Sequence, residues 1–409
     1  MKTPIAHTPP MGWNSWNTFG WNINEELIKT TADFFVESGL RDAGYEYIVI
    51  DDMWSLKERD SEGRLQPDPA KFPHGMKYLS DYVHSLGLKF GIYSCGGYLT
   101  CGGYPGSYGH EWLDAQTFAE WGVDFLKYDY CFHPASVDGA TIYRRMGIAL
   151  ANCGRDILFS ACSWGSDNTR QWIRETGAHT WRSTGDISDS WASIKSIAWS
   201  QITAQEYNAP GCYNDMDMLV VGMNGQGNVG LTGCTEDEYR FHFGLWAFLQ
   251  SPLMIGCDIR NMSEETKRIL MNKDIIALNQ DTSCHQVYIA NNALQVFGTE
   301  EKRPVPTPDR QPEEPFYQYT DYSLSRSTMV RYLENGDIAV IRLNFRDHDT
   351  SNAPLVVTAD MLGLSEECAK KMRVKDLWTG EELPLVNGTI PNHGCAPHSC
   401  QVYRIQLNA

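Results

Sequence analysis

The sequence lacks the features that membrane proteins and nucleic-acid-binding proteins need. No run of the 409 residues reaches the roughly 18 apolar residues of a membrane-spanning helix. The first twenty residues hold no apolar segment of signal-peptide length, so the chain as given is predicted to be cytoplasmic, although a secreted protein whose signal had been removed would leave the same sequence. Basic residues are few, with 34 Lys and Arg against 51 Asp and Glu and a net charge of −17. This balance opposes binding to nucleic acid or to an anionic membrane, and it favours a neutral ligand.

The cysteines and histidines also lack the number and spacing that a disulfide scaffold or a metal site needs. Twelve cysteines in 409 residues are too few for a disulfide scaffold, and none of them shows the paired CxxC spacing of a zinc site. The eleven histidines form no metal-ligand spacing. We therefore predict neither a metal nor a cofactor.

The first part of the chain alternates between strand and helix patterns. Eight apolar, β-branched runs are typical of strands: 11–16, 45–52, 89–94, 124–130, 157–162, 180–186, 214–221 and 252–258. Helical patterns lie between and after them, at 24–40, 75–88, 113–122, 190–202, 235–250 and 263–280. Asn24 is a predicted helix cap, and Thr235 with Glu238 forms a capping-box pattern. The alternation predicts a (β/α)8 TIM barrel over residues 1–284, in the α/β class.

The pattern changes after residue 284. Short alternating runs at 337–345, 353–361, 372–380 and 399–407 are separated by Pro, Asn and Gly. This pattern predicts an antiparallel β-sandwich domain over residues 285–409. The Pro- and Glu-rich stretch 299–316 is predicted to be a long exposed loop.

Polar residues gather where the predicted barrel strands end, which is the catalytic face of this architecture. They are Asp51 and Asp52, Tyr93, Lys127 and Asp129, Arg182 and Asp186, and Asp215 and Asp217. The carboxylate pair Asp129 and Asp186 fits glycoside hydrolysis, in which one carboxylate stays ionised and the other stays protonated. Lys127 would favour the ionised form of Asp129. The simplest alternative is that Lys127 and Asp129 form an internal ion pair without catalytic meaning.

Two other function classes remain open at this point. The stretch GQGNVG at 225–230 matches the glycine pattern of dinucleotide-binding oxidoreductases, but LTGC separates it from the helix cap at Thr235. A glycine-rich loop over the barrel mouth is the alternative for this stretch. A lectin that binds sugars on the same fold without cleaving them is the other class, and the two carboxylates argue against it.

Seven segments of the chain match one known family in order and spacing. They read MGWNSW, YIVIDDMW, GIYS, DAQTFAEWGVDFLKYDYC, WRSTGDI, YNDMDML and PLMIGCD. On these segments the chain resembles glycoside hydrolase family 27, the α-galactosidase and α-N-acetylgalactosaminidase family, over essentially its whole length. The resemblance implies a retaining exo-glycosidase in which Asp129 is the nucleophile and Asp186 the general acid and base. It also implies a set of substrate-binding residues: Trp16, Asp51, Asp52, Tyr93, Lys127, Ser163, Trp164 and Arg182.

The resemblance also bears on the sugar and on two cysteines. Galactose-specific members commonly carry Glu where this chain has Ser163, whereas members that accept a 2-acetamido group carry Ser there and a small residue three positions later, here Ser166. We favour a terminal α-galactoside as substrate, with α-N-acetylgalactosaminidase or β-L-arabinopyranosidase activity as alternatives. Cys101 and Cys131 occupy the places of a family disulfide. The sequence predicts neither their redox state nor the oligomeric state.

Overall fold

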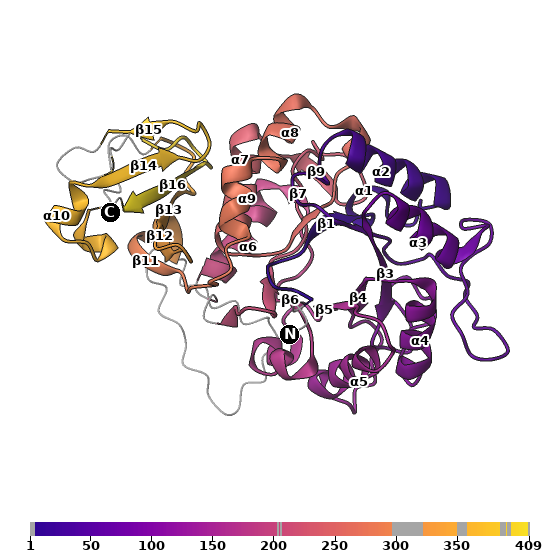
Figure 1. Cartoon of the computed structure of the whole chain (residues 1–409). Helices are drawn as coiled ribbons and strands as arrows, with labels where there is room; N and C mark the ends of the chain where they lie inside the picture. Colours follow the sequence, from indigo (N-terminus) through magenta and orange to yellow (C-terminus); the bar gives the residue numbers. More distant parts are fainter. Residues whose placement is uncertain are drawn as a thin grey trace.

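The computed structural model describes residues 5–202, 204, 207–296, 322–349, 358–384, 390 and 394–407. Eight parallel strands form one curved sheet in the order β10-β1-β2-β3-β4-β5-β6-β8 (Figure 1). A parallel bridge between Leu219 and Ile255 links the segment after β8 to β10 and closes the sheet on itself. The strands are β1 (Met11–Asn14), β2 (Tyr47–Val49), β3 (Lys89–Cys95), β4 (Phe125–Asp129), β5 (Leu158–Cys162), β6 (Thr180–Arg182), β8 (Tyr213–Asp215) and β10 (Leu253–Ile255). All eight predicted barrel strands are confirmed.

Helices surround the sheet, and the two caps predicted at Asn24 and Thr235 are confirmed. The side chain of Asn24 accepts a hydrogen bond from the Leu27 amide, and Thr235 with Glu238 forms a complete capping box. The helices are α1 (Trp16–Phe19), α2 (Glu25–Glu37), α3 (Gly75–Ser85), α4 (Glu111–Trp121), α5 (Gly139–Ala151), α6 (Trp191–Ile202), α7 (Glu236–Phe248), α8 (Glu264–Leu270) and α9 (Lys273–Asn279).

Two helix predictions need correction. Helix α5 was not predicted, although Asp138 caps it by accepting from the Thr141 amide at 2.8 Å and its buried residues have helical spacing. The predicted single helix 263–280 is two helices, because Asn272 interrupts it and its side chain caps α9. No helix among the described residues is both long and apolar enough to cross a lipid bilayer.

The C-terminal part is a six-stranded antiparallel sheet in the order β11-β12-β13-β16-β14-β15. Its strands are β11 (Tyr288–Val296), β12 (Tyr322–Tyr332), β13 (Ile338–Asn344), β14 (Met372–Asp376), β15 (Glu382–Leu383) and β16 (Cys400–Leu407). The strands predicted at 337–345, 372–380 and 399–407 are confirmed. Of the strand predicted at 353–361, residues 353–357 lie outside the described part, and Asp360–Leu362 is a short 3-10 helix. The predicted loop 299–316 lies outside the described residues, and the domain boundary at residue 284 stays a prediction.

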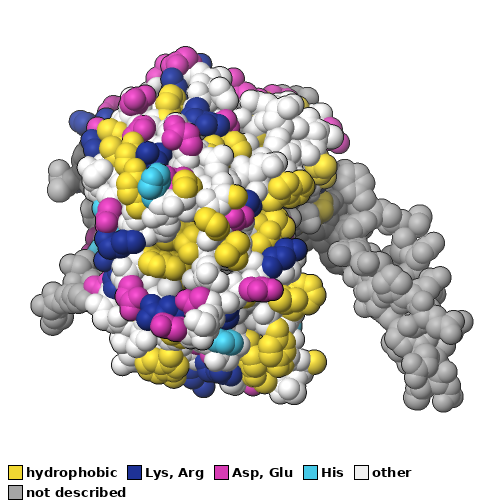
Figure 2. Space-filling model, turned by 90° about the vertical axis from the view of Figure 1, so that its right-hand side faces the viewer, with side chains coloured by type: hydrophobic (Ala, Val, Ile, Leu, Met, Phe, Trp, Pro, Cys, Tyr) yellow, Lys and Arg dark blue, Asp and Glu magenta, His cyan; other side chains and the backbone are white. Residues whose placement is uncertain are grey.

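The C-terminal sheet packs against α6, α7 and α9, on one side of the barrel (Figure 1). The ring of His398 stacks on Trp191 with centroids 4.3 Å apart, and Phe345 meets Phe241 at 5.0 Å. Lys375 pairs with Asp274 at 2.6 Å. On the barrel face shown in Figure 2, acidic and basic side chains are interspersed and do not form one field of a single sign.

Candidate active site

Asp129 ends β4 and is almost completely buried, at 6% exposure. Its Oδ2 accepts a hydrogen bond from the Tyr93 hydroxyl at 3.1 Å, and its Oδ1 accepts from the Tyr130 amide at 2.9 Å. Burial raises the pKa of Asp129 to about 6, although the positive charge of Lys127 opposes that rise. The predicted effect of Lys127 is therefore present, but desolvation outweighs it.

Asp186 lies four residues after the end of β6 and is held by Arg182. An Arg182 Nη2 donates to Asp186 Oδ1 at 3.0 Å, while 69% of the Asp186 side chain remains exposed. Partial desolvation favours the neutral form of Asp186, but the charges of Arg182 and Lys127 outweigh it and lower its pKa. The prediction has Asp129 ionised and Asp186 protonated. The pKa shifts favour the reverse, because the pKa of Asp129 is raised and that of Asp186 is lowered.

Asp217 is a pocket residue that the predicted site set did not contain. Its Oδ1 pairs with Arg182 Nη1 at 3.0 Å, with both side chains buried, and its Oδ2 accepts from the Ile187 amide at 2.6 Å. Its backbone has φ +79°, a left-handed conformation that is rare outside glycine. The polar doublet of Asp215 and Asp217 at a strand end was the available signal.

Lys127 pairs with Asp51 rather than with Asp129. Its Nζ lies 2.7 Å from Asp51 Oδ2, which also accepts from the Asn14 amide group at 2.8 Å. The alternative of a self-contained Lys127 and Asp129 ion pair is therefore wrong. Asp52 is oriented separately, because its Oδ2 accepts from the Gly102 amide at 2.7 Å.

These side chains converge on one pocket at the carboxyl ends of the strands, with about 480 Å³ of empty space including its open mouth. Of the predicted set, the residues that line it are Trp16, Asp51, Asp52, Tyr93, Lys127, Asp129, Trp164, Arg182 and Asp186. The structure adds Asn17, Cys101, Asp217, Met218 and Val229 to the lining. Charged groups and two tryptophans in one pocket suit a sugar, which combines hydroxyl groups with apolar C–H faces.

Ser163 is the predicted binding residue that does not line this pocket. It is completely buried at the end of β5, and its Oγ lies 2.5 Å from Thr169 Oγ1. Thr169 Oγ1 in turn donates to the Ser166 carbonyl at 2.6 Å. Trp164, whose backbone has φ +56°, reaches the pocket in its place.

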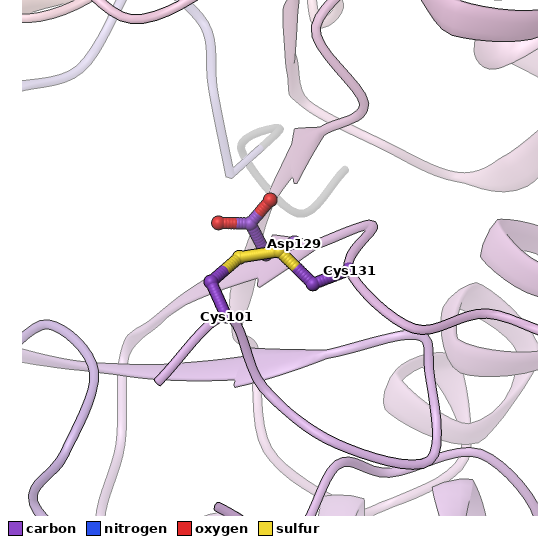
Figure 3. Close-up of side chains that lie close together, drawn as sticks. All are labelled: Cys101, Asp129 and Cys131. Carbon is purple, nitrogen blue, oxygen red and sulfur yellow. A yellow bond between two sulfur atoms is a disulfide. The ribbon is translucent and has the colours of Figure 1, made fainter. Parts of the chain in front are cut away.

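The sulfur atoms of Cys101 and Cys131 are bonded to each other, with Cα atoms 5.2 Å apart. Figure 3 shows the Asp129 carboxylate directly beside this disulfide. The ligand atoms of these three residues lie within 4.8 Å of one another, close enough for a metal ion. Because the sulfurs are bonded to each other, they are not free thiolates, and this cluster is a poor metal site.

The glycine-rich stretch 225–230 does not open a helix. It leads into β9 (Gly230–Gly233), whereas α7 begins only at Glu236. The Val229 amide donates to the Asn17 carbonyl at 3.0 Å, and Val229 lines the pocket. The glycine-rich loop over the barrel mouth is therefore confirmed, and the geometry of a dinucleotide-binding turn is not present here.

Two family models match this chain, and both describe α-galactosidases. The model described as alpha galactosidase A matches residues 8–281, and the model of the alpha galactosidase C-terminal beta sandwich domain matches residues 325–405. The chain belongs to glycoside hydrolase family 27. Membership makes the protein a glycoside hydrolase and confirms a TIM barrel followed by a β-sandwich domain.

Individual family 27 proteins resemble the chain over nearly its full length. Alpha-galactosidase 3 of Arabidopsis thaliana is 43% identical over 405 residues, which span 98% of this chain and 83% of the plant protein. The crystal structure of alpha-galactosidase I from Mortierella vinacea has a TM-score of 0.83 and 33% identity, covering 100% of this chain and 99% of that one. A β-L-arabinopyranosidase from Geobacillus stearothermophilus has a TM-score of 0.80 at 23% identity, covering 98% of this chain and 97% of that one. The shared fold alone therefore does not identify the sugar that this protein binds.

Proposed function

We propose that this protein hydrolyses terminal α-D-galactosyl residues from galactosides, with net retention of configuration. The observation that supports this proposal best is the shared pocket of Asp129 and Asp186, which also contains charged groups suited to sugar hydroxyls. Two curated relatives, 43% and 40% identical over 98% of this chain, are named α-galactosidases.

The reaction would proceed by double displacement. In the first step the Asp129 carboxylate attacks the anomeric carbon, the bond to the aglycone oxygen breaks, and Asp186 gives its proton to that oxygen. In the second step the Asp186 carboxylate takes a proton from water, whose oxygen attacks the anomeric carbon and releases Asp129. Tyr93 donates a hydrogen bond to Asp129 Oδ2, which would orient the carboxylate for attack through its lone pairs.

The first step needs one proton on the carboxylate pair, and it must be on Asp186. Because the pKa of Asp129 is raised to about 6 and that of Asp186 is lowered, the proton lies mostly on Asp129. The reactive arrangement is thus the minor one of the two singly protonated forms. Two causes act together: burial raises the pKa of Asp129, and the ion pair of Arg182 with Asp186 favours the ionised form of Asp186.

The position of Ser163 favours a galactoside over a 2-acetamido sugar. A serine that accepts the acetamido group would have to present its hydroxyl to the pocket, whereas Ser163 is buried and bonded to Thr169. The specific observation for α-N-acetylgalactosaminidase activity is the serine at position 163, because galactose-specific members of the family commonly carry the larger Glu there.

Hydrolysis of three nitrophenyl glycosides tests the sugar: α-galactoside, α-N-acetylgalactosaminide and β-L-arabinopyranoside. We expect kcat/KM on the α-galactoside to exceed the others by about 100-fold or more, because a pocket built for one set of polar groups leaves them unpaired with the wrong sugar. NMR of the first-formed sugar should show the α-anomer. A preference for the acetamido sugar, or a first-formed β-anomer, would contradict the proposal.

A further inference from the structure

One buried amide side chain connects two residues of the pocket wall from behind. Asn14 is the last residue of β1 and is only 3% exposed. Its Nδ2 donates to Asp51 Oδ2 at 2.8 Å, and its Oδ1 accepts from the Trp16 amide at 2.8 Å. Asp51 and Trp16 both line the pocket, and Asn14 lies behind them.

The two partners fix the orientation of this amide group. An ionised carboxylate only accepts hydrogen bonds and a backbone N–H only donates them, so the Asn14 nitrogen must face Asp51 and its oxygen must face Trp16. A flipped amide would place oxygen against oxygen and N–H against N–H. Leucine has neither group, and aspartate would bring a second negative charge to Asp51. Asparagine supplies both the donor and the acceptor that this position needs.

The Asn14 amide completes a set of hydrogen bonds that holds the Asp51 carboxylate. Lys127 Nζ donates to the same Oδ2 at 2.7 Å, and the Asp52 amide donates to Oδ1 at 2.9 Å. An ionised carboxylate has about four lone-pair sites, so these three bonds from described residues leave about one, on Oδ1. Asp51 is thus a fixed acceptor in the pocket wall with one site left for a sugar hydroxyl.

The fold of this segment does not account for a polar side chain at position 14. Burial of an amide group costs free energy unless it is hydrogen-bonded, and an apolar residue would avoid that cost. The connection from β1 to β2 is already made by Ser15, whose amide donates to the Val49 carbonyl at 3.1 Å and whose Oγ accepts from the Asp51 amide at 3.0 Å. The backbone of Asp51 is therefore held without Asn14, whereas its carboxylate is not.

We propose that Asn14 is a positioning residue for hydrolysis, which holds the Asp51 carboxylate in the orientation that accepts a sugar hydroxyl. This inference rests on the proposed hydrolysis of galactosides and adds to it a residue that does not touch the substrate. Without the Asn14 amide, Oδ2 of Asp51 keeps only its bond to Lys127, and the carboxylate can rotate about its side-chain bonds. Part of the free energy of sugar binding is then lost in fixing it again.

A double-mutant cycle tests whether Asn14 acts through Asp51. The variants are Asn14→Leu, Asp51→Asn and the two combined, with kcat and KM measured on nitrophenyl α-galactoside. We expect Asn14→Leu alone to lower kcat/KM by about 10- to 100-fold, mainly by raising KM, because a hydroxyl away from the reacting bond is bound before and during the reaction. In the Asp51→Asn protein the same change should cost less than about threefold, because the carboxylate that Asn14 orients is already absent.

Asn14→Asp separates the two hydrogen bonds of the amide. This variant keeps an acceptor for the Trp16 amide, but it replaces the donor to Asp51 by a carboxylate of like charge. We expect it to lose about tenfold or more in kcat/KM at neutral pH. If Asn14→Asp kept the activity of the parent protein, the hydrogen bond to Asp51 would have no positioning role. This variant also provides the test if Asn14→Leu does not fold.

Asn279→Leu is the matched control. Asn279 is completely buried at the end of α9, where its Nδ2 donates to the Ser251 carbonyl at 2.7 Å and its Oδ1 accepts from Gln280 Nε2 at 2.7 Å. It has the same pattern of one bond given and one accepted, but it is not a pocket residue. Asn279→Leu should lower the melting temperature and leave kcat/KM nearly unchanged.

Two results would overturn the role of Asn14. One is an equal loss of kcat/KM in Asn14→Leu and Asn279→Leu, which would indicate a general effect on the fold. The other is a loss that multiplies in full in the double variant, which would show that Asn14 does not act through Asp51. Failure of the proposed function would look different, because the parent protein would then hydrolyse another glycoside, on which the same cycle is measured.

Discussion

Two of the hollows formed by the described residues lie at opposite ends of the barrel, and the larger of these two is not the candidate active site. The larger hollow has about 1100 Å³ of empty space and is lined where strands begin, for example by Met11 of β1 and Lys89 of β3. The smaller one, with about 480 Å³, is lined where strands end, for example by Asp129 of β4. Size therefore does not identify the site in this molecule.

The two ends differ in how their charges are placed. At the strand starts, Glu46 and Lys89 form an ion pair of 2.8 Å in which both side chains are 43% exposed. At the strand ends, the pair of Lys127 and Asp51 has a similar length of 2.7 Å, but the exposures are 16% and 2%. Because water screens exposed charges, only the second pair can act strongly on a bound substrate.

The two ends of the barrel also differ in backbone conformation. Met53, Trp164 and Asp217 have positive φ angles, and each lies within about four residues of the end of a barrel strand. No described residue other than glycine that lines the larger hollow has one. Of the residues other than glycine that line these two hollows, those with a positive φ are Trp164 and Asp217, and both line the smaller one, which indicates function there.

The largest expected effect is the loss of activity in Asp129→Gly. Because Asp129 is the proposed nucleophile, kcat should fall by about four orders of magnitude or more. Added azide should restore part of the activity, because a small anion can occupy the vacated space, and the product should be the β-galactosyl azide. Full activity without azide would remove Asp129 from the role of nucleophile.

Asp124→Asn provides the matched change at the other end of the barrel. Asp124 lines the larger hollow, accepts from the Phe90 amide at 2.9 Å and pairs with Arg155. This substitution should lower the melting temperature and leave kcat/KM nearly unchanged. A large loss of kcat/KM in Asp124→Asn would contradict the functional contrast between the two ends.

The next largest expected effect is a loss of hydrolysis rate in Asp186→Asn that depends on the leaving group of the substrate. A general acid matters most for poor leaving groups, so hydrolysis of an alkyl galactoside should slow by about 100- to 10,000-fold. An aryl galactoside with an acidic phenol should keep most of its rate in the first step, which a pre-steady-state burst measures. An equal slowing on both substrates would assign the acid role to another residue.

Most of the fold was predictable because it follows from local patterns. Strands such as β4 and β5 are short apolar runs of the length and composition that the pattern rule expects, and their polar ends fall on one face by topology alone. The helix α5 was missed, although Ile142, Met146 and Ala149 are buried at helical spacing. The local pattern of the sequence therefore contains this helix as well.

The partners inside the site were not predictable in the same way. Lys127 is two residues from Asp129 in sequence, yet it pairs with Asp51 from a neighbouring part of the barrel. Ser163 follows a strand directly, yet a turn directs its hydroxyl to Thr169 and not to the pocket. Both outcomes depend on side-chain directions across segments, which a sequence pattern does not contain.

A smaller effect is expected in the pH dependence of kcat/KM. The carboxylate pair must carry one proton, and it loses that proton as the pH rises through the raised pKa of Asp129, about 6. Above that pH, kcat/KM should fall about tenfold per pH unit. The positive charge of Lys127 lowers the pKa of Asp129, so removing it in Lys127→Met should raise that pKa. The fall in kcat/KM should then begin at a higher pH. If the fall in kcat/KM began at the same pH or at a lower pH in Lys127→Met, it would not be due to Asp129.

The smallest effect should come from Lys89→Met, the same substitution at the other end of the neighbouring strand. Lys89 begins β3 and is half exposed, and its Nζ contacts Glu46 and lies 4.9 Å from the centre of the Tyr47 ring. Loss of such a screened pair should cost less than about 1 kcal/mol in the free energy of urea unfolding. The pH profile and kcat/KM should match those of the parent protein. If Lys89→Met instead shifted the pH limb as Lys127→Met does, the charges at the strand starts would reach the catalytic pair, and exposure would not be what separates the two ends.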